Sequence, residues 1–389
     1  MHSPLSARNP AEAAVLERAA SKGADRPLRL LALVPRPTGA SPGQRYRIEQ
    51  WAPVLAARHG ITIDFAPFES PGLSRILYQP GHTAEKIGRV SFDFVRRLSA
   101  VTRARRYDGA LVYREASLVG PAFYERLLTG LKIPFFFDFD DAIWLEGQPG
   151  ASANGLFSRM HFWGKTSTNC RLASAVLVGN AYLAAYAAER NSKVFILPST
   201  IDLAKYPVQP EPAPDSPFVI CWTGSASTLA HFETARAALE RFAAQRPTVI
   251  RIICSHPPER PIAGAENVFV PWSEQGEAEA VGACHVGIMP LPDNQYTQGK
   301  CGMKALQYMA TGRPVVIAPV GMNRDLVQHG ENGFLAATDD EWVDALTRLA
   351  DSPDLRRRMG DAGRRTVEDH YSGEAVAAKF AEAIRSTIG

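Results

Sequence analysis

A glycine-containing turn that leads into a helix is the segment of this sequence best suited to bind an anion. It begins the stretch GKCGMKALQYMATGRPVVIAPVGMNRDLVQHGENGFLA, residues 299–336. Gly299 and Gly302 let backbone N–H groups approach a ligand, and a helix start adds a positive dipole end. Lys300 and Lys304 would share one helical face. These features favour a phosphate or diphosphate ligand. The alternative is that the glycines serve close packing and the lysines are simply exposed to solvent.

An apolar strand runs directly into a group of carboxylates in the segment FFFDFDDAIW, residues 135–144. Asp138, Asp140 and Asp141 lie at the expected end of this strand. Carboxylates at the carboxyl end of a parallel strand face the ligand cleft, where Asp140 or Asp141 could bind hydroxyl groups or act as a general base. The alternative is that one of them caps the following helix.

The elements that must position these residues alternate between strands and helices, which is typical of parallel α/β sheets. We expect strands at 28–34, 61–65, 110–113, 135–137, 175–178, 194–197, 218–222, 249–254, 268–270, 286–290 and 314–317. We expect helices at 44–59, 83–106, 121–131, 181–190, 230–245, from about 302, and at 339–350, 353–368 and 373–386.

A proline-rich segment divides the chain into two domains. Residues 206–217, YPVQPEPAPDSP, hold five prolines in twelve residues, too many for a regular element. We therefore predict an α/β protein with two doubly wound, Rossmann-like domains that face each other across a cleft. The predicted parts are a flexible tail at 1–26, an N-terminal domain at 27–205, a linker at 206–217, a C-terminal domain at 218–372, and a helix at 373–389 that could pack back on the N-terminal domain.

Length and composition agree with this division and exclude several classes of protein. The chain has 389 residues, of which 46% are hydrophobic and 21% charged, so it suits a soluble protein with more than one core. A net charge of +3 is far below what nucleic-acid binding favours. Five scattered cysteines without Cys-x-x-Cys spacing suggest neither disulfides nor zinc. No secretory signal or membrane span is visible, so we expect a cytoplasmic protein.

The segment after the glycine turn resembles glycosyltransferase family 4, the retaining enzymes of the GT-B fold. LQYMATGRPVVIAPVG, residues 306–321, is similar to the family's LEAMACGxPVVA pattern, and ENGFLA to its xNGxLV. More loosely, ILPSTID at 196–202 is similar to VIPNGVD, and CWTGSAS at 221–227 to the turn written xxVGRL. The resemblance implies a glycosyltransferase with an N-terminal acceptor domain and a C-terminal nucleotide-sugar domain.

The sequence departs from this family at the residues that usually carry its chemistry. Gly299 and Gln307 stand where the Glu-x7-Glu motif has its two glutamates. The Arg and Lys that follow the VG turn are replaced by residues 225–228, SAST. We interpret the chain as a variant branch in which Lys304 takes over the phosphate charge. Gln307 keeps an amide that can bind a ribose or sugar hydroxyl but has no carboxylate charge.

The resemblance assigns the remaining candidate residues by position. Lys304 is placed with Asp140 and Asp141 as catalytic, and the donor would be bound by Gly224, Ser225, Lys300, Gly302, Met303, Gln307 and Trp272. Trp272 would lie beside the nucleotide base, or else be an ordinary core aromatic. The loop TGASPGQRYRIEQ, residues 38–50, would offer Gly43, Arg45 and Arg47 to an anion or acceptor, unless these arginines are simply exposed on a helix.

The resemblance also implies that the reaction needs no metal and no cofactor besides the nucleoside diphosphate sugar. The Asp-x-Asp at Asp138 and Asp140 is similar to the metal motif of GT-A transferases, but those have a different fold. The expected substrates are a nucleotide-sugar donor and a hydroxyl acceptor on a glycan, a lipid-linked saccharide or a small molecule. A catalytically inactive sugar-nucleotide-binding partner subunit and a GT-B epimerase acting on a UDP-sugar remain as alternatives.

The predicted helix at 83–106 is both basic and amphipathic. Apolar residues follow a helical period, and the helix also carries Lys86, Arg89, Arg96, Arg97, Arg103, Arg105 and Arg106. Such a helix can lie on an anionic membrane, which would place the protein at the inner membrane face. An apolar stripe is equally typical of the buried face of a domain helix.

Overall fold

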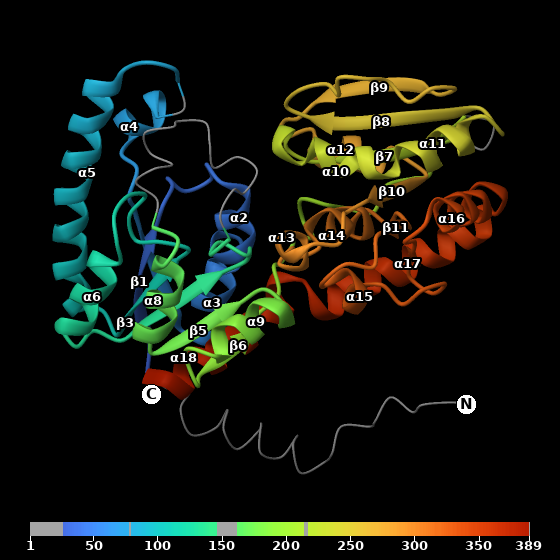
Figure 1. Cartoon of the computed structure of the whole chain (residues 1–389). Helices are drawn as coiled ribbons and strands as arrows, with labels where there is room; N and C mark the ends of the chain where they lie inside the picture. The colour runs from blue at the N-terminus through green and yellow to red at the C-terminus, as the bar shows by residue number, and fades with distance from the viewer. Residues whose placement is uncertain (1–25, 78, 146–161, 214–216, 389) are drawn as a thin grey trace, which may run out of the picture.

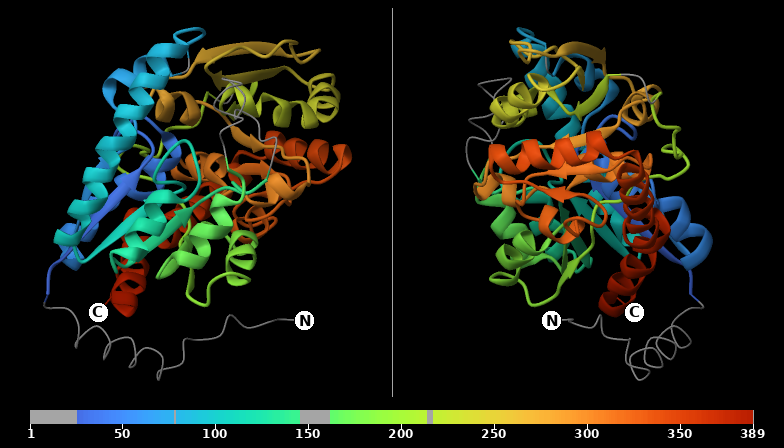
Figure 2. Two further views of the ribbon diagram at one scale, coloured as in Figure 1. Left: turned by 60° about the vertical axis from the view of Figure 1, so that its left-hand side comes forward. Right: turned by 90° about the vertical axis from the view of Figure 1, so that its right-hand side faces the viewer.

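The computed structural model describes residues 26–77, 79–145, 162–213 and 217–388. Two six-stranded sheets, each with all its strands parallel, form two domains that lie side by side (Figure 1). Helices lie against both sheets, as the separate views of Figure 2 show. This confirms the predicted α/β class with two doubly wound, Rossmann-like domains.

The N-terminal sheet has the order β2-β1-β3-β4-β5-β6. Nearly every residue of its central strands is buried, which explains why they are continuous apolar runs without alternation. The strands are β1 (Leu28–Val34), β2 (Ile61–Pro67), β3 (Gly109–Tyr113), β4 (Phe135–Phe139), β5 (Ala175–Val178) and β6 (Val194–Ile196).

The C-terminal sheet has the order β12-β11-β10-β7-β8-β9. Because the order reverses between β7 and β10, the carboxyl ends of these two strands form a crevice where ligands of such sheets usually bind. The strands are β7 (Phe218–Thr223), β8 (Thr248–Cys254), β9 (Glu266–Pro271), β10 (Val286–Met289), β11 (Val315–Ile317) and the short β12 (Phe334–Leu335), which the sequence did not predict.

Helices connect the strands and cover the sheets. The N-terminal domain contains α2 (Pro42–Gln44), α3 (Ala52–His59), α4 (Pro71–Ile76), α5 (Thr83–Arg103), α6 (Phe123–Gly130), α8 (Lys165–Leu172) and α9 (Ala181–Ala188). The rest of the chain contains α10 (Leu229–Phe232), α11 (Arg236–Ala243), α12 (Glu277–Gly282), α13 (Gln295–Gln298), α14 (Met303–Ala310), α15 (Asn323–Leu326), α16 (Asp339–Asp351), α17 (Pro353–His370) and α18 (Gly373–Ile388).

Two predicted helices are interrupted. The one expected at 44–59 contains a π-helical turn, Arg45–Glu49, before α3, and the one expected at 230–245 is divided by a 3-10 turn, Glu233–Ala235, between α10 and α11. Both interruptions lie just after the strands that begin their domains.

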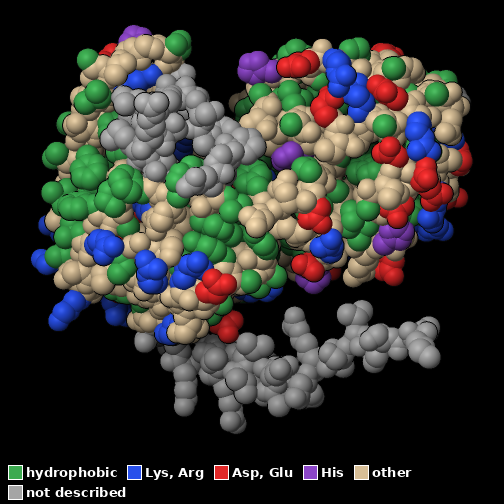
Figure 3. Space-filling view, in the orientation of Figure 1, with side chains coloured by type: hydrophobic (Ala, Val, Ile, Leu, Met, Phe, Trp, Pro, Cys, Tyr) green, Lys and Arg blue, Asp and Glu red, His purple; other side chains and the backbone are tan. Residues whose placement is uncertain are grey.

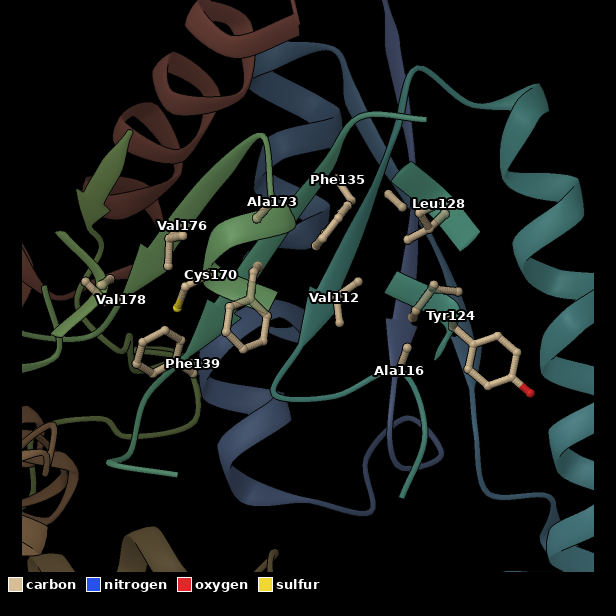
Figure 4. Close-up of a cluster of buried hydrophobic side chains, with 14 of the residues drawn as sticks. Val112, Ala116, Tyr124, Leu128, Phe135, Phe139, Cys170, Ala173, Val176 and Val178 are labelled. Atoms are coloured by element: carbon tan, nitrogen blue, oxygen red, sulfur yellow. The ribbon is translucent and has the colours of Figure 1, made fainter. Parts of the chain in front are cut away.

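Aromatic and aliphatic side chains fill the space between the N-terminal sheet and its helices (Figure 4). Phe135, Phe137 and Phe139 point to the same face of β4 because side chains alternate along a strand. Tyr124 and Leu128 of α6 and Cys170 of α8 complete the buried cluster. This packing fixes β4, whose carboxyl end carries the acidic residues.

The last helix, α18, packs on the N-terminal domain although it follows the C-terminal one (Figures 1 and 2). The ring of Phe380 lies 4.3 Å from that of Trp51, centroid to centroid. An Nη2 of Arg385 donates to the backbone oxygen of His59 at 2.7 Å. The N-terminal core therefore includes residues from both ends of the described chain.

Replacing Phe380 by Ala should lower the free energy of unfolding of the N-terminal domain by about 3–5 kcal/mol, because the change leaves a cavity beside Trp51. Urea denaturation followed by tryptophan fluorescence measures the effect. Glu382→Gln, on the exposed face of the same helix, is the control and should change stability by less than about 0.5 kcal/mol. Equal stability of the two variants would contradict the assigned packing.

Candidate functional site

The residues at the carboxyl ends of the strands meet where the two domains touch. Asp140 and Asp141 follow β4, Gly224 and Ser225 follow β7, and Trp272 follows β9. The segment 298–301 of the C-terminal domain reaches across to this edge of the N-terminal sheet. In Figure 3 the two domains form two lobes with a notch between them at the top of the view.

The carboxylates after β4 are bound by Arg114, which the sequence analysis did not single out. Its Nε and Nη2 donate to Oδ1 of Asp140 at 2.9 and 2.7 Å, and Nη2 also donates to Oδ2 of Asp141 at 2.8 Å. The hydroxyl of Tyr113 donates to the same Asp140 oxygen at 3.1 Å. Arg114 follows β3 directly, so its position at a strand end was the signal available in the sequence.

These contacts determine the charge of Asp140. Burial raises its pKa, but the positive charges of Arg114 and Arg47 outweigh burial, so the pKa of this carboxyl is below its ordinary value. Asp140 is therefore ionised at neutral pH and already accepts three hydrogen bonds through Oδ1. It is better suited to orient neighbouring groups than to accept a proton.

Lys300 links the two domains. Its Nζ donates to Oδ1 of Asp141 and to the hydroxyl of Tyr296, both at 2.8 Å. Burial lowers the pKa of Lys300, but the charge of Asp141 outweighs it, and the net pKa is above the ordinary value. Nδ2 of Asn180 donates to the backbone oxygen of Lys300 at 3.0 Å. The charge of Lys300 is thus already compensated by the N-terminal domain.

The glycines of this region have different roles. A Cβ on Gly299 would lie 2.8 Å from the backbone nitrogen of Ala142, and one on Gly43 would lie 2.6 Å from the hydroxyl of Tyr113. Both are needed for close packing at or beside the junction. Gly302 has a φ of +66° and directly precedes α14, so it makes the left-handed turn into that helix.

Lys304, in the first turn of α14, has no counter-charge. Its Nζ lies 5.6 Å from the ring centroid of Trp222, and it makes no hydrogen bond or ion pair with any residue in the described ranges. Burial, with the charge of Lys300, lowers its pKa to about 8. The N–H groups of Met303 and Lys304 belong to the first helical turn, where no intrahelical acceptor exists. This helix start therefore offers uncompensated positive charge.

The turn after β7 lies beside the same tryptophan. A Cβ on Gly224 would lie 2.5 Å from the Trp222 ring, so only glycine lets the backbone approach this closely. Ser225 is exposed, and its Oγ is 2.9 Å from that of Ser227. The turn thus presents small polar groups without the cations that the family pattern has here.

His231 of α10 is a residue that the sequence analysis missed. It is only 7% exposed, and its Nδ1 is buried without a hydrogen-bond partner. Burial, followed by the charges of Lys304 and Lys300, lowers its pKa to about 4. It is therefore neutral at pH 7, and the charges of both lysines disfavour its protonation.

The two arginines expected to bind an anion are engaged by protein carboxylates instead. Arg47 is buried, and its Nε and Nη2 donate to the two oxygens of Asp138 at 3.1 and 2.6 Å, while Nη1 donates to the backbone oxygen of Leu197. Arg45 forms an ion pair with Glu274 at 2.8 Å across the domain junction. Both arginines are buried, so the alternative that they are simply exposed on a helix is wrong, and anion binding by them stays a prediction.

Gln307 and Trp272 belong to one hydrogen-bonded group. Nε2 of Gln307 donates to the hydroxyls of Tyr206 and Tyr46 at 3.1 and 3.3 Å. The Tyr206 hydroxyl and Nε1 of Trp272 donate to the two oxygens of Glu277 at 2.6 and 2.7 Å. Trp272 is 38% exposed, so it is not an ordinary core aromatic: its edge is fixed and part of its ring is open to solvent.

Within the described residues, no cluster of three or more His, Cys, Asp or Glu side chains is arranged to hold a metal ion. The positive groups of the site are the start of α14 and the lysines.

Residues 217–352 match the family model described as "Glycosyl transferases group 1". A D-inositol 3-phosphate glycosyltransferase of Streptomyces griseus is 34% identical over 103 residues, 26% of this chain and 21% of the relative. An MMP alpha-(1->4)-mannosyltransferase of Mycolicibacterium hassiacum is 38% identical over 82 residues, 20% of each chain. These matches span about a fifth of the relatives' length. The C-terminal domain thus carries the sequence pattern of group 1 glycosyl transferases.

Solved structures extend the likeness to the whole fold. A sucrose-phosphate synthase from Thermosynechococcus elongatus aligns with a TM-score of 0.66 at 18% identity, over 93% of this chain and 99% of the other. A glycosyltransferase from Rickettsia africae gives 0.63 at 12% identity, over 93% and 98%. Anabaena HepE, solved in complex with UDP, gives 0.57 at 16% identity, over 93% and 100%. The chain has the GT-B fold.

Replacing Arg47 by Met should lower the free energy of unfolding by about 3–5 kcal/mol, because it leaves the Asp138 carboxylate buried without its cation. Urea denaturation checks this. The double variant Arg47→Met/Asp138→Asn, which removes the buried charge, should recover part of the loss. If the Arg47→Met variant keeps wild-type stability but binds nucleotide more weakly, Arg47 belongs to the ligand site instead.

Proposed function

We propose that this protein is a glycosyltransferase that transfers a sugar from a nucleoside diphosphate sugar to a hydroxyl acceptor. The observation that carries the proposal is the uncompensated positive charge at the start of α14, where Lys304 has no counter-ion among the described residues. The start of α14 lies beside the crevice between β7 and β10 of a GT-B fold. A diphosphate would supply the missing negative charge.

In this proposal the donor lies along the edge of the C-terminal sheet. Lys304 and the backbone N–H group of Met303 bind the diphosphate, and Ser225, in the turn that Gly224 allows to pass close to Trp222, adds a hydroxyl. The open face of Trp272 stacks on the base, because its edge is fixed by Glu277. Gln307 has its amide nitrogen engaged by two tyrosines, which leaves its carbonyl oxygen for a ribose or sugar hydroxyl.

The chemistry that these groups support is stabilisation of the leaving diphosphate. The bond between the anomeric carbon and the phosphate oxygen breaks, and a bond from the acceptor oxygen to that carbon forms. Lys304 and the start of α14 stabilise the charge that develops on the phosphate. Because Asp140 is ionised and hydrogen-bonded to Arg114, the departing phosphate is the better acceptor for the hydroxyl proton. Asp141 and Asp140 then orient the acceptor.

We propose retention of the anomeric configuration and independence of metal ions from the resemblance to family 4. The cationic helix start supports the second part, since it can replace a divalent ion as the counter-charge of the diphosphate. The acceptor is a glycan, a lipid-linked saccharide or a small molecule.

The loss of both motif glutamates motivates the alternative of a partner subunit that binds a nucleotide sugar without turning it over. A GT-B epimerase is the other alternative. Product analysis separates all three: a transferase forms a glycoside only when acceptor is present, an epimerase changes the sugar nucleotide without acceptor, and a partner subunit does neither.

Purified protein should bind one nucleoside diphosphate sugar among the UDP, GDP, dTDP and ADP conjugates, and EDTA should not change the affinity. Calorimetric titration measures both. Lys304→Ala should weaken binding roughly 10- to 100-fold, because a hydrogen bond to a charged group contributes about 1.5–3 kcal/mol. Binding should also weaken above pH 8, where Lys304 loses its proton.

The matched control is Lys379→Ala, which removes an exposed lysine from α18 and should leave the affinity unchanged. If none of the conjugates binds the wild-type protein, the proposed donor site is wrong.

We also propose that helix α5 contacts an anionic membrane and places the protein at the inner membrane face. Its outer face exposes Phe92 (64%) and Val95 (68%), and Phe123 of the neighbouring α6 is exposed beside it. Arg103, Arg105 and Arg106 are exposed where this helix ends. In Figure 3, Lys and Arg side chains gather on the lower part of the N-terminal domain. Within the described residues, no helix combines the length and apolar character that crossing a membrane requires.

The double variant Phe92→Ser/Val95→Ser should bind phosphatidylglycerol vesicles at least about tenfold more weakly than wild type. In the wild-type protein both apolar side chains leave water when the helix binds the membrane, and serine lacks this favourable contribution. Cosedimentation at low and high salt measures this. Val208→Ser, at an exposed apolar residue of the linker, is the control. If wild type binds anionic and phosphatidylcholine vesicles equally weakly, the outer face of α5 is not a membrane-binding surface.

A further inference from the structure

Three nitrogen groups without acceptors lie around the carboxyl end of β7. Nε1 of Trp222 and Nδ1 of His231 are buried and lack hydrogen-bond partners, and the Lys304 ammonium has no counter-ion among the residues in the described ranges. Buried polar groups in proteins are nearly always satisfied, so a group of orphans at one place needs an explanation. All three can donate hydrogen bonds, and a phosphate beside Lys304 would bring acceptors to this part of the structure.

The fold holds these groups in fixed positions. Trp222 is the fifth residue of β7, and its ring packs 5.7 Å from that of Phe232, the neighbour of His231 on α10. The Lys304 ammonium lies 5.6 Å from the Trp222 ring from the side of α14. Gly224 allows the turn after β7 to pass against the edge of this ring. His231 itself is buried on α10, with its Nδ1 unpartnered, next to the residue that packs on the Trp222 ring.

We propose that His231 is a further ligand of the donor diphosphate and that it takes up a proton when the nucleotide sugar binds. This inference rests on the proposed function, because it concerns the same donor site. A protonated His231 on α10 supplies part of the positive charge that the turn after β7 lacks.

The charges facing His231 explain why the proton arrives with the ligand. In the free protein, burial and the positive charges of Lys304 and Lys300 oppose an imidazolium, and the pKa is about 4. Lys300 is itself paired with Asp141, and the nearby Glu233 is paired with Arg236 and Arg260. A diphosphate adds two negative charges, which compensate the lysines and favour the charged imidazole.

The sign of the pH dependence follows by linkage. Because the pKa of His231 is higher in the complex than in the free protein, its contribution to affinity is largest below the free value of about 4 and is lost as the pH rises through the bound value. The deprotonation of Lys304 near pH 8 produces a separate loss at higher pH. The two titrations occupy different pH ranges, so variants can separate them.

Calorimetric titration of the full chain with UDP-glucose, and with the GDP, dTDP and ADP sugars, tests the inference. Both phosphates of these compounds are diesters that do not titrate between pH 5 and 9, so proton uptake reports on the protein. At pH 6.5, PIPES and Bis-Tris buffers should give binding enthalpies that differ by the uptake of a fraction of a proton. The wild-type affinity should fall as the pH rises from 5.5 to 7.5.

His231→Gln should abolish this uptake and weaken binding about tenfold at pH 5.5, with a smaller effect at pH 7.5. His231→Lys, which supplies a charge that does not titrate in this range, should restore affinity and flatten the pH profile. His370→Gln, at an exposed histidine of α17, should behave as wild type, and circular dichroism verifies that each variant is folded.

The outcomes distinguish this inference from the function on which it rests. If a nucleotide sugar binds but His231→Gln has wild-type affinity, or if wild type takes up no proton, the role of His231 is overturned while the donor site stands. If no nucleotide sugar binds wild type at any pH, the proposed function itself fails.

Discussion

The domain junction is organised by the need to compensate charges that lie at the carboxyl ends of two buried sheets. Asp138 has Arg47, Asp140 and Asp141 share Arg114, and Asp141 also holds Lys300 from the other domain. A partly buried ion is costly unless a partner offsets its loss of hydration. These carboxylate–cation pairs therefore determine which loops of the two domains can approach one another. Lys304 forms no such pair with a described residue, and it lies beside the crevice where we propose that the donor binds.

The positions at which the family 4 pattern has two glutamates carry no negative charge in this chain. Gly299 provides close packing against the N-terminal domain, and Gln307 is neutral within a group of tyrosines. The ammonium of Lys300 pairs with Asp141 of the opposite domain. This contact joins the two domains, so the relative position of the domains is part of the site.

The architecture was predictable from sequence because it depends on local patterns. Continuous apolar runs identified eleven of the twelve strands. The missed strand, Phe334–Leu335, has two residues and no pattern of its own. The roles of Arg47 and Arg114 were not predictable, because each depends on a partner 26 to 91 residues away. The properties of His231 were not predictable either, because they depend on two lysines about 70 residues away. Sequence spacing indicates where charges occur but not which charges meet.

The return of α18 to the N-terminal domain means that the chain passes between the domains twice, once near Ile201 and once near Ser372, and these two residues pair with each other. The segment from Tyr206 to Pro210 already packs on the C-terminal domain. Two covalent connections that lie side by side limit how far the domains can separate or twist. They also affect biosynthesis. The strands of the N-terminal domain are made before the C-terminal domain and α18 after it, so the N-terminal core can close only after the C-terminal domain has been synthesised.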